Sequence, residues 1–166
     1  MTGPVRSAGH GRRADGAIVT WTLAEGRRGR RWRETVVGGD LGGHSLLYET
    51  AVDGTFSHLE LASPTGLATL HPEGDGTLHG NVIDVDGVRH VEGWPYPAGT
   101  VVMVAGSVVA GAALRWAGAQ PGALAIVIDP ASGALEARAL TRGDLIATDP
   151  AGRPLLVDGT TWPLER

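Results

Sequence analysis

The sequence contains no cysteine and no lysine, and aromatic residues make up only 5% of it. Without cysteine the chain forms no disulfide and offers no thiolate nucleophile or thiolate zinc ligand. Such a chain suits a reducing compartment, so we expect a cytoplasmic protein. Every hydrophobic run ends well before the ~18 residues that span a membrane, and residues 1–16 lack the apolar stretch of a signal peptide.

The remaining composition indicates one folded domain. The 166 residues are 42% hydrophobic and 19% charged, which is enough to bury a core in a chain too short for two ordinary domains. Residues 1–15 are rich in glycine and arginine and show no hydrophobic periodicity, so they predict a flexible tail. We expect the folded domain to comprise residues 16–166.

Positive charge is concentrated near the N-terminus. Residues 1–33 hold eight arginines and two acids, whereas residues 34–166 hold six arginines and sixteen acids. An acidic body repels phosphate backbones, and we therefore expect no nucleic-acid partner. The run GRRGRRWR at 26–33 contains Trp32, and an aromatic among arginines can stack on bases. A solvated hairpin is the more frequent structure for such a run, and we favour that interpretation.

Short alternating runs follow the predicted tail, separated by turn sequences such as VDG, PEGDG, DVDG and DPASG. Strands and turns that alternate about every 8–12 residues are typical of antiparallel β-structure. Two alanine-rich stretches, 108–117 and 133–142, resemble helices in composition, but Gly111 and the flanking turns favour strands. We interpret Trp21 and Trp162 as core residues that close the fold. The sequence thus predicts an all-β domain, an antiparallel β-roll or partly open β-barrel with little or no helix.

Catalytic motifs are missing from the sequence. It has no phosphate-binding P-loop, no G-x-S-x-G motif and no H-E-x-x-H motif. No spacing of histidines and carboxylates is diagnostic of a metal site. Function must therefore be sought in polar residues two apart, because positions i and i+2 project from the same face of a strand. Three such pairs are His58 and Glu60, Asp84 and Asp86, and His90 and Glu92.

These polar faces have two interpretations. They either point to water, with the leucines and valines between them buried, or they line a ligand cavity. In the second interpretation we predict His90, Glu92 and Asp86 as catalytic acid–base groups. The ligand would then contact Tyr48, Phe56, His58, Glu60, Asp84, Arg89, Trp94 and Tyr96.

Three motifs occur in a characteristic order along the chain. Trp21 precedes LLYETAVD at 46–53, LHGNVIDVD follows at 78–86, and DPAGRPLLVDGTTW closes the chain at 149–162. This order resembles a bacterial family of spiral β-roll proteins described as glycolipid-binding, which implies the same fold and a lipid-like ligand. The segment GVRHVEGWPYP at 87–97 departs from that family's Thr-Pro-x-Thr-Asn stretch. The segment that we predict to face the ligand therefore has different side chains from those of the family.

Two functions follow from this reading. The first, slightly favoured, is binding of a hydrophobic or amphipathic small molecule, lipid-like or polyketide-like, in the cavity of the roll. The alternative is a cofactor-free enzyme in the same cavity, a cyclase, isomerase or hydrolase of a hydrophobic biosynthetic intermediate. Neither function requires a cofactor or a metal.

Overall fold

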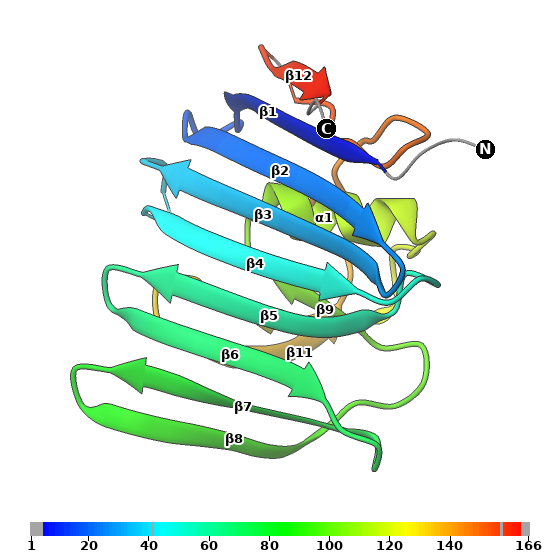
Figure 1. The fold of residues 1–166 in the computed structure, drawn as a ribbon. Coiled ribbons are helices and arrows are strands. Elements are labelled where there is room, and N and C mark those ends of the chain that lie inside the picture. The colour runs from blue at the N-terminus through cyan, green and yellow to red at the C-terminus, as the bar shows by residue number, and fades with distance from the viewer. Residues whose placement is uncertain (1–4, 41, 157, 164–166) are drawn as a thin grey trace.

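The computed structural model describes residues 5–40, 42–156 and 158–163, without the side chains of residues 160–163. Nine strands form one large antiparallel sheet in the order β12-β1-β2-β3-β4-β5-β6-β7-β8 (Figure 1). The strands are β1 (Arg6–Arg12), β2 (Ile18–Gly26), β3 (Gly29–Val37), β4 (His44–Thr50), β5 (Phe56–Ser63), β6 (Gly66–Pro72), β7 (Thr77–Asp84), β8 (Gly87–Pro95) and β12 (Thr160–Pro163).

A smaller sheet and one α-helix follow β8 in the chain. The small sheet has the order β11-β10-β9, and its β9 and β10 are parallel. Parallel strands need a crossover, and α1 supplies it between them. These elements are β9 (Val101–Val104), α1 (Val108–Trp116), β10 (Leu124–Ile128), β11 (Leu135–Ala139) and the short 3-10 helix η1 (Arg142–Asp144).

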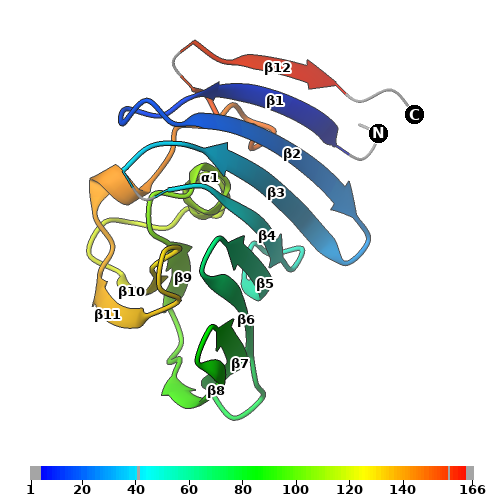
Figure 2. The ribbon, with the colours of Figure 1, turned by 90° about the vertical axis from the view of Figure 1, so that its left-hand side faces the viewer.

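The large sheet curls around the helix and the small sheet, which lie together on its inner face (Figure 2). Its strands β8 and β12 are the two ends of the strand order, so the sheet is not closed. The fold is therefore an open β-roll, and the fold class predicted from the sequence is confirmed. No helix in the described part of the chain is long and apolar enough to cross a membrane.

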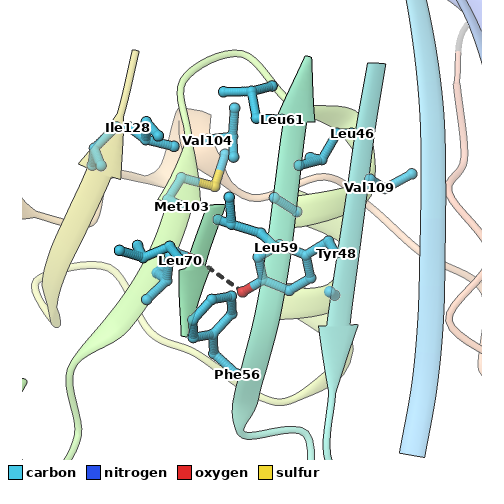
Figure 3. Packing of buried hydrophobic residues seen from close by; sticks show 14 of the residues in the cluster. Leu46, Tyr48, Phe56, Leu59, Leu61, Leu70, Met103, Val104, Val109 and Ile128 are labelled. Atoms are coloured by element: carbon cyan, nitrogen blue, oxygen red, sulfur yellow. Dashed lines mark hydrogen bonds between the residues drawn. The ribbon is translucent and has the colours of Figure 1, made fainter. Parts of the chain in front are cut away.

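Strict alternation along the strands builds the core. In β3, every second residue from Arg30 to Val36 is buried and the residues between are exposed. Trp21, predicted as a core residue, is 1% exposed, whereas the side chain of Trp162 lies outside the described part of the structure. Leucines of the large sheet pack against Met103, Val104 and Ile128 of the small sheet, as Figure 3 shows.

Two sequence interpretations are wrong in their local structure. Residues 6–12 do not form part of a tail, because Arg6–Arg12 pair with β2 along their whole length. Residues 108–116 form a helix rather than a strand. Gly111 faces residues 144–146, where a Cβ would lie 2.4 Å from the carbonyl oxygen of Asp144, so this glycine is compatible with the helix and needed for its packing. The second alanine-rich stretch contains the strand β11, as predicted.

Candidate functional site

The structure contains an open cavity of about 570 Å³ near the N-terminal end of α1. Ligand cavities of drug-sized molecules have volumes of about 300–1,000 Å³, so this one is large enough for a small organic molecule. Five separate segments border it: the β1–β2 turn, the β3–β4 connection, β9 with its connection to α1, residues 143–147 and residues 155–156. Its wall is formed by Arg12, Arg13, Ala14, Asp15, Asp40, Met103, Gly106, Ser107, Val108, Gly143, Asp144, Leu145, Ile146, Ala147, Leu155 and Leu156.

Apolar side chains form the larger part of this wall. Met103 and Val108 are fully buried behind it, while Ile146 and Leu156 are half-buried and pack against the core. Leu155 is 55% exposed, which is unusual for a leucine that lies in a cavity wall. Partly exposed apolar side chains around a concavity are what a hydrophobic ligand would cover.

The polar side of the cavity is held by a pair of residues in the β1–β2 turn. Arg13 forms a salt bridge with Asp15, and its other guanidinium nitrogen donates to the carbonyl oxygen of Gly106 at 3.0 Å. Asp15 also accepts hydrogen bonds from the backbone amides of Ala17 and Asp40. Burial alone would raise the pKa of Asp15, but the hydrogen bonds from Arg13 and the two amides outweigh it and lower the pKa.

A second paired carboxylate, that of Asp144, also lines the cavity. Arg138 donates two hydrogen bonds to its oxygens, at 2.7 and 2.9 Å, and the backbone amide and hydroxyl of Thr141 donate two more. These donors lower the pKa of Asp144 to about 2, against the opposing effect of burial. Both carboxylates are therefore fixed, ionised parts of the wall and are poorly suited to proton transfer near neutral pH.

Behind the wall, the start of α1 is anchored by a buried carboxylate. Glu34 accepts hydrogen bonds from the amides of Val108 and Val109, both at 3.0 Å. Its other oxygen lies 2.8 Å from Nε2 of His44. The hydroxyl of Ser107 accepts from the amide of Ala110 and caps the helix. Free amides at a helix start favour a negative group, which explains how the sheet can hold Glu34 inside the core.

The residues that sequence analysis assigned to the site do not gather around this cavity. Tyr48 and Phe56 belong to the central core, with ring centroids 5.4 Å apart. The Tyr48 hydroxyl donates to the carbonyl oxygen of Val102 at 2.8 Å, and burial raises its pKa far above the usual value (Figure 3). The Tyr48 side chain therefore joins the large sheet to β9.

The predicted catalytic His90 and the predicted ligand-binding His58 lie on the outer face of the large sheet, away from α1 (Figure 2). His90 is exposed and its Nδ1 lies 2.6 Å from the side-chain oxygen of Asn81. His58 and Glu60 form a pair with each other on the same outer face, 3.1 Å apart. These positions agree with the interpretation in which the polar faces point to water.

Two irregularities in strand pairing explain why some residues two positions apart lie on different faces of the sheet. The register shifts between Glu49 and Thr50, so Phe56 lies inside and His58 lies outside. A second shift lies opposite Leu78 and Gly80. It places Glu92 on the exposed side, although Trp94 is half-buried and packs against the core.

The remaining predicted residues lie at the β7–β8 turn and beyond β8. Asp84 accepts from the amide of Asp86, which defines a tight turn, and Asp86 and Arg89 are exposed. Tyr96 is half-buried against the core, and burial raises its pKa. The structure therefore distributes the predicted site over the core, the outer face and a turn.

Sequence reasoning missed the cavity residues because they come from distant parts of the chain. The local signal was the turn sequence RRADG at 12–16, which contains Arg13 and Asp15 and overlaps the end of the predicted tail. Among the described residues, no three histidines or carboxylates are grouped to hold a metal ion. Comparison with known protein families, characterised proteins and solved structures finds no match for the chain.

Proposed function

We propose that the protein binds a hydrophobic or amphipathic small molecule in the cavity beside the N-terminal end of α1. The observation that supports this proposal most directly is the combination of volume and lining. A space of about 570 Å³ has a mainly apolar wall. The carboxylates of Asp15 and Asp144 in this wall are already neutralised by salt bridges with arginines. Such a wall favours an apolar body over a small charged metabolite.

The free polar groups of the cavity lie at its rim. Arg12 and the carboxylate of Asp40 are exposed there and have no side-chain partner among the described residues. They suit a ligand with an apolar body and a polar end that stays near water. The resemblance to glycolipid-binding β-roll proteins favours the same ligand class.

The chemistry of the wall favours binding over catalysis. Among the described residues that line the cavity there is no histidine, and the Ser107 hydroxyl is occupied as the helix cap. Asp15 and Asp144 are held ionised by Arg13 and Arg138. General acid–base catalysis needs a group whose pKa lies near the working pH, and neither aspartate meets that condition.

Fluorescence titration with 11-(dansylamino)undecanoic acid tests the proposal, after native mass spectrometry of the freshly purified protein for a co-purified ligand. We expect saturable binding to the parent protein. Leu155→Glu places a charge on the apolar wall at an exposed position, and it should weaken binding by about tenfold, or 1.4 kcal/mol.

The matched control is Leu124→Glu. Leu124 is 43% exposed and lies in β10, outside the cavity wall. This variant should bind the probe as the parent does. If the parent does not bind the probe saturably, or if both variants lose affinity equally, the cavity is not the binding site.

A further inference from the structure

A second cleft, of about 700 Å³, lies at the opposite end of β2 and β3 from the cavity. It surrounds the β2–β3 turn, where the arginine run predicted as a solvated hairpin is found. Trp32 of that run is buried in the core, so it offers no ring for stacking. The cleft is lined by Arg6, Ala24, Glu25, Gly26, Arg27, Arg28, Gly29, Arg30, Arg31, Glu49, Thr50 and Ser57.

The strand register explains how the arginines meet. Arg6 of β1 lies opposite Ala24 of β2, and Ala24 lies opposite Arg31 of β3. Neighbouring strands are about 4.8 Å apart, so Arg6 and Arg31 are separated by about 10 Å across one small side chain. The exposed Arg27 and Arg28 lie in the turn at the end of the same strands. These four arginines thus line one cleft together with Ala24, Gly26 and Gly29, whose side chains are small or absent.

The two acids of the cleft pair with Arg30 and Arg31 and leave its other three arginines unpaired among the described residues. Glu25 accepts from Arg30 at 3.0 Å, and Glu49 accepts from Arg31 at 2.7 Å. Within the part of the chain that the structure describes, Arg6, Arg27 and Arg28 have no hydrogen-bond or ion-pair partner. The cleft is therefore strongly cationic in a protein whose formal net charge is −4.

Unpaired polar atoms are also present in two buried residues of the cleft. Nε of Arg30 and the hydroxyl of Thr50 have no partner in the described structure, and both residues are less than 10% exposed. The rest of the Arg30 guanidinium is fixed by Glu25 and by the carbonyl oxygen of Ala151. Both residues occupy the buried face of the sheet, where Arg30 packs on Trp116, so contacts between the cleft and a ligand come from the exposed arginines.

We infer that this cleft binds the phosphate groups of a phosphorylated ligand, with Arg6, Arg27 and Arg28 as the principal contacts. This inference goes beyond the proposed function and concerns a separate site. Guanidinium groups bind phosphate oxygens through paired N–H donors, and three arginines line this cleft with no carboxylate bound to them in the described structure. The concave shape and the acidic remainder of the surface favour a compact phosphate or diphosphate over a nucleic-acid strand.

Isothermal titration calorimetry with inorganic pyrophosphate at low ionic strength tests the inference. The parent protein should bind pyrophosphate saturably. The triple variant Arg6→Gln, Arg27→Gln, Arg28→Gln should bind it about tenfold or more weakly, because it removes the charge-assisted hydrogen bonds. The control triple Arg89→Gln, Arg115→Gln, Arg142→Gln removes the same charge at exposed positions outside the cleft and should change affinity less than about twofold.

Two further titrations identify the source of the phosphate. If the protein co-sediments with vesicles that contain phosphatidic acid, the phosphate belongs to a lipid headgroup. If the protein stays in the supernatant but still binds pyrophosphate, the ligand is a soluble phosphorylated molecule. Leu155→Glu should leave pyrophosphate binding unchanged, which separates this site from the apolar cavity. Loss of affinity in both triple variants alike, or no saturable binding to the parent, overturns the inference. So does binding of an oligothymidylate without binding of pyrophosphate.

Discussion

Glu34 and His44 form a buried pair in which Nε2 of the imidazole lies 2.8 Å from the carboxyl group, and both side chains are at most 1% exposed. The pair lies on the neighbouring strands β3 and β4, and the second carboxyl oxygen holds the first two amides of α1. One acidic residue therefore connects two strands of the large sheet to the helix that bounds the cavity.

The first prediction concerns this connection. Glu34→Gln keeps the shape of the side chain but removes its charge and one acceptor oxygen, so amide groups of α1 or His44 lose a partner in the core. We expect the free energy of unfolding to fall by about 2–3 kcal/mol in urea denaturation. The control Glu49→Gln breaks the solvent-exposed pair with Arg31 and should cost less than about 1 kcal/mol. Equal denaturation midpoints for the two variants would contradict the prediction.

The second prediction concerns the contact between α1 and the cavity wall. Alanine is normally the better helix former by about 1 kcal/mol, but a Cβ at Gly111 would lie 2.4 Å from the Asp144 carbonyl oxygen and 2.8 Å from Cγ1 of Ile146. Gly111→Ala should therefore destabilise the protein by about 1–3 kcal/mol and weaken binding of the dansyl probe. Gly74→Ala, at an open position, serves as the control and should leave both measurements unchanged. If the Gly111→Ala protein is more stable than the parent, residues 144–146 can move away from the added Cβ and the prediction is wrong.

The third prediction concerns the cation–π contact between Arg30 and Trp116. The guanidinium carbon lies 3.7 Å from a ring centroid of Trp116, and Arg30 is 7% exposed. A double-mutant cycle with Arg30→Met and Trp116→Leu should give a coupling energy of about 1–2 kcal/mol. The same cycle with Arg31→Met, on the outer face, should be additive. Additivity in both cycles would mean that Arg30 contributes through its hydrogen bonds alone.

The fourth prediction follows from the pKa of Asp144, which is lowered to about 2 in the folded protein from 3.8. A carboxylate with a lowered folded-state pKa contributes stability above its unfolded pKa and loses it as the pH falls. The parent should therefore lose about 1–2 kcal/mol between pH 4 and 2 from this group. Asp144→Asn should lack this part of the acid transition, and Arg138→Gln should reduce it. An unchanged acid limb in the Asn variant would exclude the assigned role of the pair.

The alternating strands could be predicted from the sequence, because each buries one face against the same core and turn residues mark each end. Alternation and turn residues were sufficient to predict the hairpins from β2 to β8. The faces of individual residues were harder to predict. One extra residue in β5 and in β8 reverses the period of two, so Phe56 separates from His58, and Trp94 separates from His90. Pairing irregularities of this kind leave no mark in hydrophobicity.

The sequence did not predict the helix α1, the strand β1 or the cavity, and the reasons differ. Gly111 lowers helix propensity, and only the close approach of residues 144–146 shows why glycine is required there. The strand β1 was read as a tail because its inward positions are Ser7, Gly9 and Gly11, which have no hydrophobic signal. The cavity combines segments more than 90 residues apart, as the hydrogen bond from Arg13 to Gly106 illustrates. No local pattern encodes that juxtaposition.

The free edge of β8 has a consequence for how copies of the chain meet. An exposed edge strand is a template on which a second molecule can extend the hydrogen-bonded ladder. In β8 the exposed Arg89 and Glu92, the positive φ of Gly93 and the missing amide hydrogen of Pro95 interrupt that template along its length. Edge-to-edge growth into fibrils or swapped dimers is therefore disfavoured at this border, and the protein can keep its sheet open without a partner strand.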